Sequence, residues 1–185
     1  MMKKNPMLIG LFVTLGVVLV SYLIYEFVLE KKDSYLITNP SNELIKINLN
    51  DKTYSIAPQQ TTAVQLEGGE HRLHFTYKGE EVDTLINITR FNAIINPTRA
   101  EYYVFVRPYG PGRNRDSIFT SHTITIDEKV YYGDIKRYDD LYIQDFYYNL
   151  DQDYPKFFLN KGAKTDLSKI FSKEDFKQFY FENYE

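Results

Sequence analysis

Residues 43–50 read ELIKINLN, with an apolar side chain at every second position. Successive side chains of an extended strand point to opposite faces, so this alternation predicts a β-strand with one buried face. Residues 50–52, NDK, predict a tight turn at the end of this strand. The chain then returns at 53–57 with two further apolar residues in alternation, which predicts a hairpin.

Alternating segments of this kind recur along the chain at spacings of about 8–12 residues, as is typical of sandwiches and barrels. Gly68 and Gly69 favour a turn between two of them, because glycine readily adopts positive φ. The predicted strands are 43–50, 53–57, 61–66, 71–78, 81–89, 101–107, 118–126 and 129–132. We expect a mainly β fold, an antiparallel β-sandwich-like domain in which residues 43–89 form a meander.

The last fifty residues have a different character. Residues 138–154 read YDDLYIQDFYYNLDQDY, a mixture of aspartate and aromatic residues without a sustained period. Ser172, followed three positions later by an acidic residue, predicts the N-cap of a helix over 173–183. Three rings in that segment, Phe176, Phe179 and Tyr180, share one helical stripe and should pack on the sheet.

The front of the chain is strongly apolar. Residues 7–29 read MLIGLFVTLGVVLVSYLIYEFVL, with Glu26 as their only charge. A helix of this length spans about 34 Å, enough for a hydrocarbon core of about 30 Å. A cleaved signal peptide would need a shorter apolar run and a small-x-small site, and Leu19-Val20-Ser21 is a poor one. We therefore expect a retained transmembrane helix in contact with the lipid bilayer.

The charges that flank this segment bear on orientation. Lys3 and Lys4 precede it and Lys31 and Lys32 follow it, so the count of basic residues is balanced. A short basic N-terminus before a first apolar segment usually stays in the cytoplasm. We expect a single-pass protein with its main domain outside the cytoplasm, and three parts: an anchor at 1–32, a β domain at 33–133 and an Asp- and aromatic-rich extension at 134–185.

Composition excludes several classes of function. The chain has no cysteine, which excludes disulfides, thiolate zinc sites and a cysteine nucleophile. Its net charge of -3 argues against a nucleic-acid partner, which normally requires a basic excess. The 17 tyrosines and 13 phenylalanines are expected mainly to fill the core. We expect no cofactor.

The loop 107–116, RPYGPGRNRD, is the first candidate site. Arg107, Arg113 and Arg115 form a basic group on an acidic domain and could contact an anion or an acidic partner. A solvated connection with Pro and Gly at the turns is the alternative. No Lys-Ser/Thr pair or helix start follows, so the loop is no phosphate-binding fingerprint.

Carboxylates and histidines are the other candidates. The acidic stretch contains Asp134, Asp139, Asp140, Asp145, Asp151 and Asp153. Paired carboxylates could serve a hydrolase or hold Ca²⁺, but the spacing lacks the glycine and distal glutamate of a calcium loop. His71 and His74 should point to opposite faces of a strand, and His122 stands apart, so we expect no metal site.

Two stretches resemble known proteins. Residues 50–75, with a Tyr-x-Ile-x-Pro segment and Gly-Glu-His-x-Leu-x-Phe, resemble PEGA-like surface β-domains. Residues 94–110, with Ile-Ile-Asn-Pro-Thr, and 171–176 resemble bacterial single-pass membrane-anchored proteins. The resemblance implies a fold and no catalytic residue. PEGA-like modules are often repeated, whereas the sequence shows no evident internal repeat.

These observations favour a membrane-anchored, non-enzymatic envelope protein with a β-rich binding or scaffolding domain. An envelope protein or polysaccharide is the expected partner. Two alternatives stay open: an envelope hydrolase that uses carboxylates in 134–153, and a membrane-tethered adaptor that faces the cytoplasm.

Overall fold

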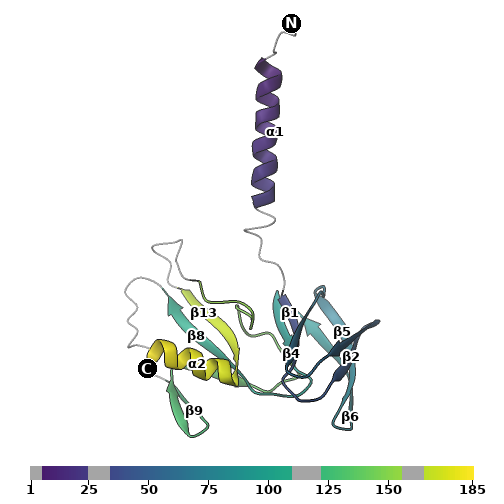
Figure 1. Ribbon diagram of the computed structural model, residues 1–185, viewed down its shortest axis with the longest axis vertical. Coiled ribbons are helices and arrows are strands. Elements are labelled where there is room, and N and C mark those ends of the chain that lie inside the picture. The colour runs from purple at the N-terminus through teal and green to yellow at the C-terminus, as the bar shows by residue number, and fades with distance from the viewer. Residues whose placement is uncertain (1–5, 25–33, 110–121, 156–164) are drawn as a thin grey trace. The chain divides into compact units, whose positions relative to one another are not determined.

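The computed structural model describes residues 6–24, 34–109, 122–155 and 165–185. The chain divides into two compact units, residues 1–32 and residues 33–185 (Figure 1). The first unit contains helix α1 (Pro6–Ile24), and the second contains thirteen described strands and helix α2 (Lys173–Tyr184). The second unit is mainly β, as the sequence predicts.

Helix α1 carries no charged residue, and its side chains from Gly10 onward are exposed. The hydroxyl of Thr14 donates to the carbonyl of Gly10 at 3.0 Å, so this polar group is satisfied within the helix. In the described part of the chain, no helix combines the length and the apolar character needed to cross a membrane. Residues 25–29 of the predicted membrane segment lie outside the described residues.

The strands of the second unit form three sheets and a hairpin. They are β1 (Ser34–Asn39), β2 (Ile45–Leu49), β3 (Lys52–Ile56), β4 (Gln60–Val64), β5 (Gly69–Tyr77), β6 (Glu80–Ile88), β7 (Asn92–Ile95), β8 (Tyr102–Tyr109), β9 (Thr123–Ile126), β10 (Lys129–Tyr132), β11 (Asp134–Tyr138), β12 (Tyr142–Ile143) and β13 (Thr165–Ser172). The central sheet has the order β12-β7-β1-β4, the first outer sheet β3-β2-β5-β6, and the second outer sheet β11-β8-β13. Among the described strands, β9 and β10 pair with each other and with no third strand.

The two middle strands of the central sheet, β1 and β7, are buried on both faces. In β1, Ile37 belongs to the cluster against the first outer sheet, and its neighbour Leu36 belongs to the cluster against the second. In β7, Ile95 belongs to the cluster against the first outer sheet and its neighbour Ile94 belongs to the cluster against the second. The two strands run parallel, which is typical of strands covered on both sides. The second unit therefore has three β layers rather than the two of a single sandwich.

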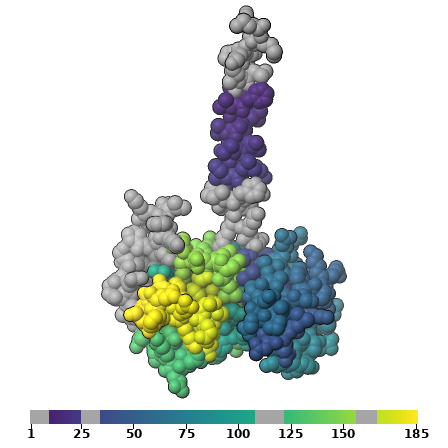
Figure 2. All heavy atoms as spheres, in the orientation of Figure 1, coloured from purple at the N-terminus to yellow at the C-terminus, as the bar shows by residue number. Residues whose placement is uncertain are grey.

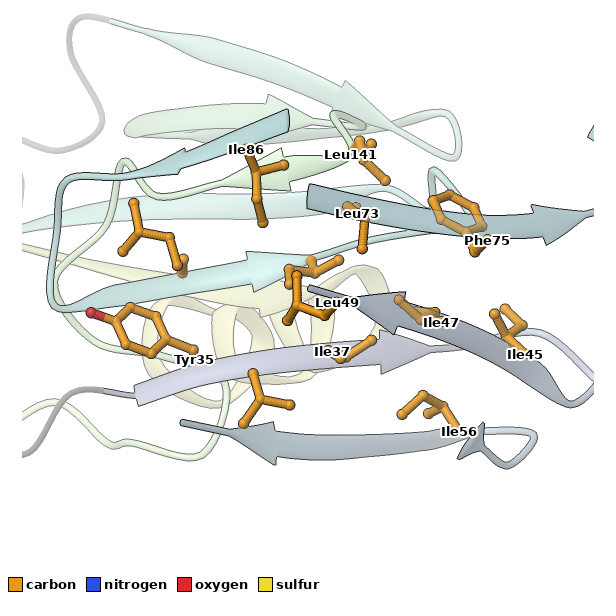
Figure 3. Close-up of a cluster of buried hydrophobic side chains, with 14 residues drawn as sticks. Tyr35, Ile37, Ile45, Ile47, Leu49, Ile56, Leu73, Phe75, Ile86 and Leu141 are labelled. Atoms are coloured by element: carbon orange, nitrogen blue, oxygen red, sulfur yellow. The ribbon is translucent and has the colours of Figure 1, made fainter. Parts of the chain in front are cut away.

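The cluster between the central and first outer sheets is aliphatic (Figure 3). Alternate residues of β2 and β5 point into it, as the sequence pattern predicts. Ile37, Ile47 and Leu73 are fully buried there. Burying an aliphatic side chain of this size stabilises a fold by about 1.5–3 kcal/mol, so this cluster holds the two sheets together.

Helix α2 covers the free face of the second outer sheet. Ser172 accepts a hydrogen bond from the backbone N–H of Asp175 and caps the helix, which confirms the predicted start. Phe176 is fully buried and stacks on Tyr103 of β8, with ring centroids 5.5 Å apart. Tyr180 packs edge-on against Tyr131 of the β9–β10 hairpin at 5.0 Å. The predicted aromatic stripe therefore faces the sheet.

The strand order repeats within the second unit. In the first half, residues 34–88, β1 enters the central sheet, β2 forms the middle of an outer sheet between β3 and β5, and β4 returns antiparallel to β1. In the second half, residues 92–184, β7, β8, β11, β12 and β13 repeat these roles, with β9–β10 inserted. Figure 2 shows the first half in blue beside the green and yellow second half.

Two buried asparagines mark corresponding points of the halves. Asn39 at the end of β1 donates to the carbonyl of Glu43, and its side-chain oxygen accepts from the hydroxyl of Ser41. Asn96 after β7 donates to the carbonyl four residues later and accepts from the hydroxyl of Thr98, two residues later. Proline follows each asparagine. The structure thus contains a repeat that is hard to see in the sequence.

Exchanging the two halves leaves the order of the central sheet, β12-β7-β1-β4, unchanged, which is the symmetry of a two-fold rotation about an axis along β1 and β7. Such a rotation preserves the parallel direction of the central strands and exchanges the two faces of their sheet. Ile37 faces the outer sheet of its own half, and its counterpart Ile94, two residues before Asn96, likewise faces the outer sheet of its own half, on the opposite face of the central sheet. The packing follows this rotation.

One part of the predicted meander is wrong. Residues 61–66 were expected beside their neighbours in one sheet, but β4 leaves that sheet and pairs with β1 in the central layer. The reason is β1 itself, SYLITN, which is buried on both faces and therefore lacks the alternation of a half-buried strand. Residues 118–121 of another predicted strand lie outside the described residues.

Candidate binding grooves

The predicted basic loop is described only at its start. Arg107 lies in β8, half-buried, with its guanidinium 5.8 Å from the centre of the Tyr154 ring. Arg113 and Arg115 lie outside the described residues. A role of these arginines in anion binding stays a prediction.

The acidic stretch does not converge on one site. Its six aspartates, Asp134, Asp139, Asp140, Asp145, Asp151 and Asp153, are all exposed. Asp145 has a cationic neighbour, with one carboxylate oxygen 3.9 Å from the Arg90 guanidinium. Within the described ranges, no group of three or more His, Asp or Glu side chains could hold a metal ion.

The histidines lie as their strand position predicts. His71 is buried and His74 is on the opposite, more exposed face of β5. The Nδ1 atom of His71 is 2.8 Å from the amide nitrogen of Asn50, and Nε2 is 2.8 Å from the carbonyl of Glu67. An amide N–H donates and a carbonyl accepts, so both ring nitrogens have partners within the protein. His71 thus ties two turns together.

A groove of about 440 Å³ lies in the second half of the domain. It is lined by Arg90, Phe91, Lys136, Tyr138, Asp145, Phe146, Tyr147, Asp166 and Ser168. Lys136 and Tyr138 come from β11, and Asp166 and Ser168 come from β13 on the other side of β8. Because the lining comes from distant segments, no local motif in the sequence indicates this groove.

The segment after β12 forms one wall of this groove and is firmly held. The backbone N–H of Tyr147 donates to the Ser168 hydroxyl at 3.0 Å and to the Ser168 carbonyl at 3.1 Å. Its carbonyl accepts a hydrogen bond from the buried amide of Asn92. The ring packs edge-on against Phe91 at 5.1 Å and against Tyr148 at 4.8 Å. Tyr147 is nevertheless 42% exposed, so a rigid ring stands at the rim.

The first half contains a corresponding groove of about 300 Å³. It is lined by Leu49, Asn50, Asp51, Lys52, Tyr54, Gln65, Leu66, Glu67 and His71. It lies between β3, the segment after β4 and the start of β5. The groove of the second half lies at the corresponding place, between β11, the segment after β12 and the start of β13. Each half therefore has a groove at the corresponding place, and the two grooves are lined by different side chains.

A buried lysine lies beside a third hollow, of about 300 Å³, next to α2. The ammonium of Lys169 donates to the carbonyls of Asn149 at 3.0 Å and Leu150 at 3.3 Å, and to the carbonyl of Gln152. Burial lowers the pKa of this ammonium, and nearby aspartates partly offset the effect. All three of its N–H bonds have acceptors, so Lys169 holds the 149–152 turn in place.

Comparison of the sequence with models of protein families and with curated proteins finds no match, and comparison of the structure with solved structures finds none. The resemblance to PEGA-like β-domains therefore stays a prediction.

Proposed function

We propose that this chain is a non-enzymatic, membrane-anchored envelope protein whose β-rich domain binds or scaffolds a partner outside the cytoplasm. Residues 7–29 serve as the single-pass anchor and contact the lipid bilayer. The described helix α1 does not by itself have the length and apolar character of a membrane span, so the proposal rests on the whole apolar segment 7–29 and on the exposed apolar surface of α1, where Leu11, Phe12 and Val17 are 57% to 65% exposed. Exposing this much apolar surface to water is unfavourable, and such a surface is typical of a segment that contacts a membrane or another protein.

Two further features support this function. The Thr14–Gly10 hydrogen bond is the kind of internal pairing that a polar side chain needs in lipid. The candidate carboxylates of residues 134–153 are solvated rather than held together in an apolar pocket, which favours a binding domain over a hydrolase.

Carbonate extraction of membranes tests the anchor. Wild-type protein should stay in the membrane pellet. The double variant V17K/L19K should move to the supernatant, because each lysine near the middle of a membrane helix costs about 2.5–3.5 kcal/mol. Leu44→Lys is the matched control, since Leu44 is an exposed apolar residue of the β domain. Extraction of the wild-type protein by carbonate would refute the anchor.

Cysteine labelling in intact cells tests orientation, and the absence of native cysteine makes a single reporter possible. A cysteine replacing exposed Lys46 in β2 should react with a membrane-impermeant maleimide. A cysteine at position 3 should react only after the membrane is permeabilised. The reverse pattern would favour a cytoplasm-facing adaptor.

A further inference from the structure

The groove of the second half, defined above by its lining from Arg90 to Ser168, contains a preorganised aromatic ring. Tyr147 is fixed through its backbone on two sides and through ring contacts with Phe91 and Tyr148. Ordering a side chain at the moment of binding costs free energy, and this ring is already ordered. Tyr147 is 42% exposed, and the exposed part of its side chain can pack against the C–H groups of a ligand ring.

The charged groups around that ring balance each other. Arg90 and Lys136 supply cationic donors, and Asp145 and Asp166 supply acceptors. The formal charges of these four described residues cancel, so together they favour neither an anion nor a cation. The 3.9 Å separation of Arg90 and Asp145 is longer than a direct hydrogen bond. A ligand hydroxyl, which donates and accepts at once, suits such a pair.

The corresponding groove of the first half has different side chains at these positions. By strand register, Lys136 corresponds to Tyr54, since they pair with corresponding residues Val104 and Ile47. Asp166 corresponds to His71 by the same register. Asp166 lies four residues before Ile170, the partner of Val104. His71 lies four residues before Phe75, the partner of Ile47. Both nitrogens of His71 bond within the protein, so that ring offers nothing to a ligand. The first-half groove also contains a tyrosine, Tyr54, and charged groups, but that ring is less exposed than Tyr147.

We propose that the groove of the second half binds a neutral glycan, with one sugar ring packed on Tyr147 and its hydroxyls bonded to Lys136, Asp145 and Asp166. The volume of about 440 Å³ accommodates a small part of a chain rather than a whole polymer, so the site holds one or two sugar units of a longer glycan. This inference rests on the proposed function, because it names the partner of the binding domain.

Calorimetric titration of the full-length protein in detergent micelles tests the proposal. The probes are hexasaccharides built from glucose, N-acetylglucosamine, galactose or mannose, with an oligogalacturonate as the anionic comparison. At least one neutral hexasaccharide should bind saturably and more tightly than the oligogalacturonate. The K136Q/D166N and Tyr147→Leu variants should each weaken binding at least about tenfold, as expected when a stacking ring or a pair of hydrogen-bonding groups is lost.

The first half supplies the matched controls. Tyr54→Leu and Asp51→Asn alter its groove and should leave glycan binding unchanged, while circular dichroism checks that every variant is folded. Saturable binding to none of the neutral probes, tighter binding of the oligogalacturonate, or equal losses in both grooves would each overturn the proposal.

Carbonate extraction of the same preparation separates this proposal from the proposed function. Membrane retention without glycan binding overturns the glycan site and leaves the anchored module standing. Extraction by carbonate with intact, variant-sensitive glycan binding supports the site and counts against the anchor.

Discussion

Replacing Lys169 with methionine should destabilise the β domain although it removes an unfavourably buried charge. Methionine preserves the length and most of the volume of the side chain. It removes the ammonium that donates to the carbonyls of Asn149, Leu150 and Gln152. The change therefore tests whether the chain from 149 to 152 depends on this one group.

Two opposing contributions determine the magnitude. A hydrogen bond from a charged donor contributes about 1.5–3 kcal/mol, so three such bonds amount to roughly 4.5–9 kcal/mol. Removing the ammonium also removes its desolvation cost, which is several kcal/mol for a buried ion. The three carbonyls then lose their donor in a mostly buried setting. We expect the free energy of unfolding to fall by about 3 kcal/mol, the lower end of what breaking a buried charged interaction costs.

Urea unfolding followed by tyrosine fluorescence measures the change, since the chain has 17 tyrosines and no tryptophan. The midpoint should fall while the slope with urea stays the same. Lys136→Met, on exposed β11 of the same sheet, is the matched control and should change stability by less than about 0.5 kcal/mol. A loss below about 1 kcal/mol for the Lys169 variant would refute the argument that its three bonds outweigh its desolvation.

The same variant should alter the pH dependence of stability. Burial lowers the pKa of Lys169 below its ordinary 10.5, so above the folded-state pKa the unfolded chain binds more protons than the folded one. Lys169 therefore makes the wild-type free energy of unfolding rise as pH increases toward 10.5. The methionine variant should lack this contribution, and an identical pH slope in the two proteins would contradict it.

Two further predictions concern the repeat and one buried tyrosine. Asn39→Ala and Asn96→Ala should each lower the free energy of unfolding by about 2–3 kcal/mol, because both leave buried carbonyls without donors, whereas exposed Asn87→Ala should have little effect. A loss at only one of the two sites would contradict their equivalence. Burial raises the pKa of Tyr103 to about 12 from 10, so its contribution is complete below pH 10 and declines toward pH 12 by about 1.4 kcal/mol per pH unit. Tyr103→Phe should remove this decline in urea titrations across that range, and exposed Tyr132→Phe should not.

The features that sequence patterns predicted well are local. Alternation in β2 and β5 predicted their buried faces, and Ser172 predicted the start of α2. A turn, a cap and a half-buried strand each depend on a few neighbouring residues, so a short window contains the needed information.

The features that sequence patterns missed depend on burial from two sides or on distant pairing. The strands β1 and β7 contain apolar runs without alternation, because both of their faces are covered. Their parallel pairing joins segments that lie far apart in the chain, so no local pattern indicates it. The Asn-Pro pairs at 39–40 and 96–97 are the signal that could have revealed the repeat.

The candidate sites also differ in whether neighbouring residues of the chain or distant segments form them. Clusters of like residues along the chain suggested the arginine loop and the aspartate stretch, yet the described aspartates are dispersed on the surface. The groove of the second half combines single residues from segments that are each unremarkable. Only the pairing of β11 and β13 on either side of β8 places Lys136 and Asp166 around Tyr147.

The sequence alone established the apolar front segment, the β character of the body and the capped terminal helix, because each follows from hydrophobic periodicity within a few turns or strands. The tertiary structure decided the three-layer arrangement, the two-fold repeat and the location of the grooves. These depend on which distant segments exclude water together, and that choice is made by packing across the whole domain rather than by any stretch of the chain.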